Sequence, residues 1–168
     1  GDTEEQTAPT ETEPTDDEPA DEPAAGGPVN ILGITSFDPE GDGDERDDLT
    51  PLAVDGDPET AWTSHTYLSP GWGSLKSGVG LILDLGEAAT VSEVEVDLVH
   101  AGVGASVWLS EEPTRDGATE LGSGSELGDT WTVSPESAAT GRYLILWFDS
   151  AATTDAGEIV GVREIVVR

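Results

Sequence analysis

Apolar residues recur at every second position in short runs from residue 29 to the end of the chain. None of these runs keeps the helical period over the length of a typical helix. The clearest alternation lies at 79–85, where Leu81, Leu83 and Leu85 share one face of a predicted strand. At 93–98 carboxylates alternate with apolar residues, which predicts a strand with one solvent-exposed face and one buried face. The pattern therefore predicts a mostly β protein with antiparallel sheets.

Further segments carry strand patterns, and Gly, Pro, Asp and Ser separate them. The run at 143–148 is apolar on both phases, as a central strand covered on both sides would be. A single helical turn is predicted at 51–54. The other strands are predicted at 29–37, 61–64, 105–109, 130–133 and 158–168. About eight strands at this spacing predict an all-β fold, an antiparallel β-sandwich.

The first 28 residues differ in composition from the rest of the chain. They hold ten of the 36 acidic residues but no basic, aromatic or large aliphatic side chain. Such a segment cannot bury enough apolar surface to offset the entropy lost on ordering, and its charges repel one another. We predict that residues 1–28 form a disordered Thr/Glu/Pro-rich linker and that residues 29–168 form the folded domain.

The net charge of the chain is −30, and its six basic residues are scattered along the sequence. Binding to nucleic acid or to an anionic lipid surface requires clustered Lys and Arg, so this charge argues against both as partners. The chain contains no cysteine, which removes disulfides, thiolate nucleophiles and Cys-based zinc sites. It also contains neither an apolar run long enough to cross a membrane nor a signal-peptide pattern.

Residues suited to catalysis are sparse in this sequence. The two histidines, His65 and His100, lie outside any serine-hydrolase or zinc motif. A G-x-S-x-G pattern is present only in broken form, at Gly122-Ser123-Gly124-Ser125. We therefore predict that the protein is not an enzyme.

A tight acidic turn lies at 54–64, with the sequence V-D-G-D-P-E-T-A-W-T-S. Glycine allows positive φ and proline presets the next φ, so the chain folds back and brings Asp55, Asp57 and Thr60 close together. Trp62 follows on an apolar phase and is expected to anchor the turn in the core. Oxygen ligands on an anchored turn fit a structural Ca²⁺ site, because Ca²⁺ is bound by several side-chain and carbonyl oxygens. The alternative is a surface Asx turn that binds no metal.

A second acidic stretch, at 38–50, alternates Asp38, Glu40 and Asp42 like a calcium loop. Leu49 occupies the position where an EF-hand places its bidentate glutamate, which excludes an EF-hand there. We expect a long acidic loop instead.

The aromatic residues divide into two groups by their surroundings. Those on predicted strands beside apolar neighbours are expected to be structural, namely Trp62, Trp131 and Trp147. Trp72 instead lies in a Gly-Trp-Gly loop, with Tyr67 and His65 nearby. Either it provides a stacking platform for a sugar ring together with these two residues, or it folds back onto the core as a lid.

The string L-A-V-D-G-D-P-E-T-A-W-T-S at 52–64 resembles the A-x-D-G-x-x-x-T-x-W signature of discoidin-like domains, also called coagulation factor type C or galactose-binding-like domains. A longer run, from Phe37 to Gly86, includes F-D-P-E-G-D-G, Y-L-S-P and G-S-L-K-S-G-V-G-L-I-L-D-L-G. This run is similar to the extracytoplasmic C-terminal domain of actinobacterial MviN-type lipid II flippases. Related copies end some actinobacterial membrane proteins and kinase-like proteins. The resemblance covers about 29–168, and its motifs are specific in the first half.

The resemblance implies a jelly roll with a Ca²⁺ ion held by the loop aspartate, by carbonyls and a threonine of the same turn, and by a glutamate of the last strand. Asp55, Asp57 and Thr60 match the first group, with Asp57 contributing its side chain or only its carbonyl. Glu164 in R-E-I-V-V stands at the position of the last-strand glutamate. The resemblance also implies an extracytoplasmic domain tethered to the cell membrane, with a membrane span preceding Gly1.

Two classes of function follow from these expectations. The first is a non-catalytic binding module of a cell-envelope membrane protein of peptidoglycan synthesis. It would recognise a glycan or peptidoglycan-type ligand or an envelope protein, with Trp72, Tyr67 and His65 as candidate ligand-binding residues. The alternative is a structural or regulatory ectodomain without a small-molecule ligand, or the sensor domain of a membrane kinase-like protein.

Overall fold

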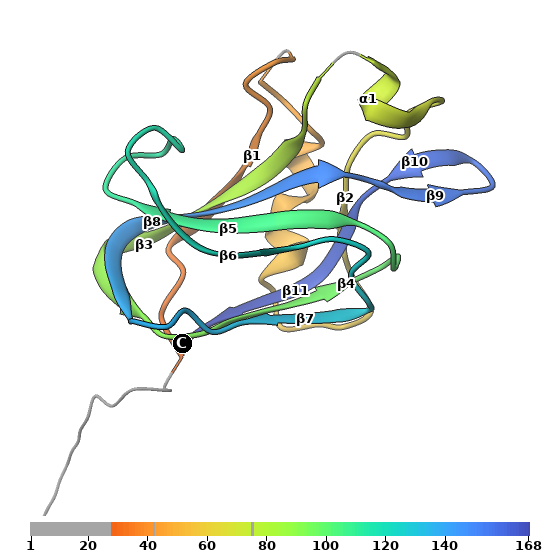
Figure 1. The fold of residues 1–168 in the computed structure, drawn as a ribbon. Coiled ribbons are helices and arrows are strands. Elements are labelled where there is room, and N and C mark those ends of the chain that lie inside the picture. Colours follow the sequence, from red (N-terminus) through yellow and green to blue (C-terminus); the bar gives the residue numbers. More distant parts are fainter. Residues whose placement is uncertain (1–27, 42, 75) are drawn as a thin grey trace, which may run out of the picture.

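The computed structural model describes residues 28–41, 43–74 and 76–168, and in this part of the chain it contains eleven strands, a 3₁₀ helix and one short helical turn (Figure 1). The linker predicted at 1–28 therefore falls almost entirely outside the described residues. Neither helical segment in the described part is long and apolar enough to cross a membrane. The 3₁₀ helix spans Asp47–Ala53 and the helical turn α1 spans Pro70–Ser74. The strands are β1 (Gly33–Phe37), β2 (Trp62–Thr63), β3 (Val79–Val91), β4 (Val94–Leu98), β5 (Gly104–Ser110), β6 (Thr119–Gly124), β7 (Thr130–Val133), β8 (Ala139–Ser150), β9 (Ala152–Thr154), β10 (Gly157–Ile159) and β11 (Gly161–Val167).

Two sheets build the sandwich (Figure 1). One has five strands in the order β1-β3-β8-β5-β6, and the other has four in the order β2-β11-β4-β7. Strands β9 and β10 form a separate hairpin that extends from the end of the sandwich beside α1 (Figure 1). Every neighbouring pair is antiparallel. The predicted antiparallel β-sandwich of the jelly-roll type is thereby confirmed.

The core lies between the two sheets, and the alternation seen in the sequence places its residues. Leu81 and Leu83 of β3 are fully buried, as are Val94 and Val96 of β4. Their strand neighbours of opposite phase point away from this core, because successive side chains of a strand face opposite sides of the sheet. Trp62 is also fully buried and stacks on Phe148, with 6.4 Å between the ring centroids.

The central strand β8 is buried on both faces, as the sequence predicted. Leu144, Leu146 and Phe148 belong to the core between the sheets. Ile145 and Trp147 point to the opposite, outer face, and yet they are only 0% and 4% exposed. Something other than the four-stranded sheet therefore covers the outer face at this point.

The structure has more strands than the approximately eight predicted, and two of them had no expected counterpart. Strand β6 was missed because its sequence T-E-L-G-S-G lacks the alternation of apolar and polar residues. Its glycines make room for neighbours, since a Cβ on Gly122 would lie 2.7 Å from the Val133 side chain. The short strand β9 pairs only with β10. The helical turn expected at 51–54 is the last part of the longer 3₁₀ helix.

Candidate functional site

The turn at 54–60 brings the predicted oxygen ligands together. One carboxylate oxygen of Asp55 accepts a hydrogen bond from the Asp57 amide at 3.0 Å, and the other accepts one from the Thr60 hydroxyl at 2.6 Å. These bonds, the hydroxyl first, hold the pKa of Asp55 below its usual value. Gly56 adopts a φ of 76°, the left-handed conformation that the predicted turn requires of a glycine.

Glu164 of β11 joins this turn from the far end of the chain. Its carboxylate accepts a hydrogen bond of 3.0 Å from the amide of Gly56. The pKa of Glu164 is raised, first by burial and then by the negative charges of Asp55, Asp97 and Asp57, although the Gly56 bond opposes the shift. The Glu164 carboxylate thus lies in a negative potential that a bound cation would relieve.

The donor set determines what kind of cation this acidic turn could hold. Among the described residues, no three His, Cys, Asp or Glu side chains are placed to share a metal ion. A site here would consist of the Asp55 and Glu164 carboxylates completed by the Thr60 hydroxyl and main-chain carbonyls, which is a donor set for a hard cation such as Ca²⁺. The side chain of Asp57 accepts a hydrogen bond from the Glu59 amide, so its carbonyl is the better candidate donor. Metal binding by Asp55, Asp57, Thr60 and Glu164 stays a prediction.

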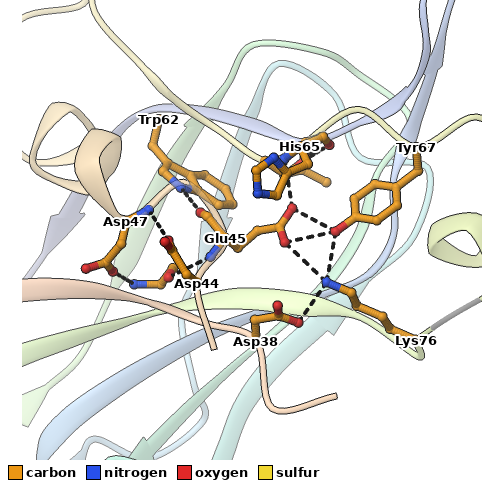
Figure 2. A network of polar contacts seen from close by, with 11 residues as sticks. Asp38, Asp44, Glu45, Asp47, Trp62, His65, Tyr67 and Lys76 are labelled. Carbon is orange, nitrogen blue, oxygen red and sulfur yellow. Dashed lines mark hydrogen bonds and ion pairs between the residues drawn. The ribbon is translucent and has the colours of Figure 1, made fainter. Parts of the chain in front are cut away.

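A buried ionic network occupies the loops near α1 (Figure 2). The ammonium of Lys76 lies 2.9 Å from a carboxylate oxygen of Asp38 and 3.3 Å from one of Glu45. The side chains of Asp38 and Glu45 are fully buried, and that of Lys76 is 9% exposed. Two carboxylates therefore share a single cation away from solvent, an arrangement that depends on that cation staying in place.

Glu45 also organises the backbone around it (Figure 2). Its carboxylate accepts hydrogen bonds from the amide of His65 at 2.8 Å and from the hydroxyl of Tyr67. Its carbonyl accepts one from the indole of Trp62 at 2.9 Å. Its own amide donates to the Ser36 hydroxyl at 3.0 Å. One residue of the acidic loop thus contacts β1 and the core tryptophan through its main chain and the loop that carries His65 through its side chain.

Tyr67 and Lys76 both hold their protons at neutral pH. Burial, reinforced by the charge of Glu45, raises the pKa of Tyr67 to about 12. Burial alone would lower the pKa of Lys76, but hydrogen bonds to Tyr67 and Asp38 and the charge of Glu45 outweigh it and raise that pKa. These two groups therefore act as fixed donors in the network.

The three candidate ligand-binding residues lie at this end of the sandwich, but they differ in exposure. Trp72 is 1% exposed and packs edge-on against Tyr67, with 5.4 Å between the ring centroids. The Trp72 ring is therefore not exposed as a stacking platform. It instead folds back onto the core as a lid, the second of the two arrangements that the sequence left open. Tyr67 is half-buried with its hydroxyl in the network, whereas the side chain of His65 is exposed. Ligand binding by these residues stays a prediction.

A left-handed turn explains the burial of Trp72. Gly71, Trp72 and Gly73 all have positive φ, at 72°, 56° and 69°. This conformation is strained for tryptophan but open to the two glycines. It turns the indole inward, where its N–H group finds no acceptor among the described residues.

The partners of Lys76 were missed in the sequence, where Asp38 and Glu45 were read only as part of an acidic loop. They lie 38 and 31 residues from Lys76, so no local spacing connects them. The one available signal was that Lys76 is the single lysine of a strongly acidic chain. This lysine has many possible acidic partners in such a chain, and the sequence does not select among them.

Solved structures that share this fold include carbohydrate-binding modules, while no protein-family profile matches the chain. A CBM32 of AlyQ, solved in complex with 4,5-unsaturated mannuronic acid, aligns with a TM-score of 0.59 at 21% identity, over 84% of this chain and 97% of that one. Chitosan-binding module 1 of a chitosanase/glucanase from Paenibacillus sp. IK-5 aligns with a TM-score of 0.59 at 20% identity, over 83% of this chain and 96% of that one. CpGH89CBM32-5 from Clostridium perfringens, in complex with GalNAc-β-1,3-galactose, gives 0.54 at 16%, over 80% and 91%.

These similarities establish the fold class, a galactose-binding-like jelly roll, which CBM32 modules share. At such low identities they show the fold alone. They give no support to the narrower resemblance to flippase domains.

Replacing Lys76 with Met tests the buried network. We expect a loss of about 3–5 kcal/mol in the free energy of unfolding, because Asp38 and Glu45 would keep buried charges without a cation. Arg46→Gln is the matched control, since Arg46 lies 3.8 Å from Asp48 in an exposed pair whose loss changes stability by less than about 0.5 kcal/mol. Urea denaturation measures the free energy of unfolding of both variants. If Lys76→Met does not fold, Tyr67→Phe is a milder variant, because it removes a hydroxyl of the network and keeps all charges. Equal stabilities of Lys76→Met and Arg46→Gln would show that the network has no need of its cation.

Replacing Glu164 with Gln tests the electrostatics of the acidic turn in a chelator-treated sample. The folded state raises the pKa of Glu164 above its ordinary value of 4.5, so its ionisation removes stability as the pH rises through that range. Glutamine keeps an acceptor for the Gly56 amide without the charge. We expect a higher melting temperature than wild type at pH 7 and no difference near pH 3. Glu136→Gln, which neutralises an exposed carboxylate between β7 and β8, is the control. A lower melting temperature of Glu164→Gln at pH 7 would contradict the unfavourable potential.

Proposed function

We propose that this protein is a non-catalytic carbohydrate-binding module that recognises a glycan through the loops near α1. The observation that carries the proposal is the jelly roll itself, since the solved structures that share it over most of their length include modules with bound sugars. The proposed glycan is an uncharged or weakly charged envelope oligosaccharide, because the strongly negative chain would repel a polyanion at long range.

The geometry of the loops supports this assignment. His65 presents an exposed imidazole on a backbone that the buried Glu45 holds in place, so the loop is preorganised for hydrogen bonds to sugar hydroxyls. Leu68, three residues further on, is 89% exposed and offers apolar contact to a sugar ring. A flexible loop would lose conformational entropy when it binds a ligand. Here the ionic network already orders the loop, so this entropy cost of binding is smaller.

The cellular setting is part of the proposal. An extracytoplasmic module tethered to a cell-envelope membrane protein, with a peptidoglycan-type glycan or an envelope partner, accords with the sequence resemblance to flippase domains. The alternative has the same fold but binds no glycan. It is a structural or regulatory ectodomain, or a kinase-linked sensor domain without a sugar ligand.

We also propose that the acidic turn binds one structural Ca²⁺. Asp55, Glu164, the Thr60 hydroxyl and the Asp57 carbonyl would be its donors. A cation there would compensate the charges around Glu164 and join the turn to β11, and it would stabilise the fold by linkage with its free concentration.

Binding of oligosaccharides tests the glycan proposal. We would titrate the protein with chitotriose, a GalNAc-galactose disaccharide and a peptidoglycan disaccharide without its stem peptide, following binding by calorimetry. We expect one of these to bind, and His65→Ala to weaken that binding about tenfold by removing a hydrogen-bonding group. The control is His100→Ala, which changes the other histidine, after β4. If none of the three binds at millimolar concentration, the ectodomain alternative replaces the glycan module.

Thermal melts in Ca²⁺, in equal Mg²⁺ and in chelator test the cation proposal. In wild type we expect Ca²⁺ to raise the melting temperature by several degrees more than Mg²⁺ does, since about 2.7 kcal/mol is gained at a hundredfold excess over Kd. Asp55→Ala and Glu164→Gln should lose that difference, while Glu136→Gln should keep it. Equal effects of the two ions, or full Ca²⁺ stabilisation of both loop variants, would identify the loop as a simple Asx turn.

A further inference from the structure

The outer face of the five-stranded sheet carries an aromatic patch that lies outside the core between the sheets. The strand registers place Phe37, Gly80, Trp147 and Ser106 in one row across β1, β3, β8 and β5. Trp108 lies on β5 in the next row, opposite Ile145. These side chains share one face of the sheet because cross-strand partners point to the same side.

The two indoles of this patch are held in defined positions. Trp147 packs edge-on against Phe37 at 5.6 Å between the ring centroids, and its ring lies over Gly78, where a Cβ would come within 2.6 Å of it. The indole N–H of Trp108 donates to the Ser106 hydroxyl at 2.8 Å. Trp147 is buried, whereas Trp108 is half-buried and keeps part of its surface in solvent.

Arg115 lies over both rings. It comes from the 111–118 connection between β5 and β6, and its guanidinium carbon lies 4.3 Å from the Trp147 centroid and 5.5 Å from the Trp108 centroid. The connection sets this position through its own turns, with the Thr114 amide bonded to the Glu112 carbonyl and the Ala118 amide to the Arg115 carbonyl. These turns place the guanidinium on the sheet, and none of the described carboxylates forms an ion pair with it.

The hydrogen-bonding groups of Arg115 are unused within the described part of the chain. No hydrogen bond or salt bridge engages its guanidinium there, although Glu111, Glu112 and Asp116 belong to the same connection. The other cations differ in this respect. Lys76, Arg142 and Arg168 pair with carboxylates at 3.1 Å or less, Arg46 lies near Asp48, and Arg163 donates to the Leu98 carbonyl.

The chemistry of such a group points to one class of ligand. A guanidinium stacked on aromatic rings keeps its N–H donors in its own plane, where they match a carboxylate in a bidentate pair. The exposed part of the Trp108 indole beside it can cover the C–H face of a sugar ring, as aromatic residues do in binding sites. A ligand that uses both features carries a carboxylate on a sugar ring.

We propose that Arg115 and Trp108 form a second carbohydrate site, on the outer face of the five-stranded sheet, for a single uronic acid unit of a glycan. The carboxylate pairs with the Arg115 guanidinium, and the pyranose ring packs on Trp108. This site is separate from the His65 loop and does not depend on the glycan site proposed there. Its one cation in an acidic domain restricts it to a lone uronate, because a run of adjacent carboxylates would be repelled by the surrounding protein.

Titration with galacturonic acid tests the site, using ¹H–¹⁵N spectra of the whole chain at 0.15 M salt to screen the net charge. The methyl ester of galacturonic acid, which lacks the charge, is the matched ligand control, and sodium sulfate tests for simple anion binding. We expect the acid to shift the indole N–H signals of Trp108 and Trp147 in a saturable way, and the ester and sulfate to leave them unchanged. Arg115→Gln should weaken binding at least about tenfold, and Arg115→Lys should also weaken it, since lysine keeps the charge but loses the planar fork.

Two further variants separate this site from the His65 loop. His65→Ala should leave the galacturonate shifts at Trp108 intact. Trp108→Phe, in which only the Trp147 indole N–H signal of the pair remains, should weaken binding as read from that signal, while the melting temperature confirms that the variant is folded. Equal shifts with sulfate, unchanged affinity in Arg115→Gln, or loss of the shifts in His65→Ala would each overturn the second site. The glycan site at the His65 loop is tested separately, by the titrations with chitotriose, the disaccharide and the peptidoglycan fragment, so either proposal can be contradicted without the other.

Discussion

The end of the sandwich near α1 depends on the buried carboxylate of Glu45. Left alone, a charge removed from water in this way would be strongly destabilising, and it is tolerated because the Lys76 ammonium, the Tyr67 hydroxyl and the His65 amide all point at it. The main-chain groups of the same residue bond to Trp62 and Ser36. A single residue thus connects the acidic 38–50 loop to the core, to β1 and to the loop at 64–67.

The network has a second effect, on the charge of the molecule. The chain carries a large excess of carboxylates, and most of those that the structure describes remain in water, where repulsion between them is screened. Asp38 and Glu45 are exceptions, and the structure places its only lysine beside them. One oxygen of Asp38 still has no partner among the described residues. The network therefore specifies the geometry of the loops more than it adds stability, because paired buried charges barely recover their desolvation penalty.

Sequence patterns predicted the sandwich because buried apolar residues alternate visibly with more exposed polar residues along an antiparallel strand such as β4. Turn chemistry likewise predicted that Asp55, Asp57 and Thr60 would meet, since glycine and proline restrict the local backbone. The patterns did not show β6, which pairs through its backbone and carries glycines where its neighbours need room. They also left the direction of Trp72 open, because a Gly-Trp-Gly segment can turn either way and only the surrounding packing selects the left-handed form. The partners of Lys76 and the position of Arg115 over Trp147 arise from tertiary structure, and no local spacing contains them.

The hydrogen bond between Gly56 and Glu164 joins residues 108 positions apart. Strand β2 likewise pairs with a distant segment, because β11 is its one strand partner within the described part of the chain. The amide of Val29 likewise bonds to the carbonyl of Val167. Three early segments of the chain therefore have no pairing partner until the last strand is in place. Contacts of such long sequence separation require a large loss of chain entropy before they contribute stability, so this domain belongs among the slowly folding β proteins. During synthesis, the acidic turn and β2 stay unpaired until the ribosome has released nearly the whole domain.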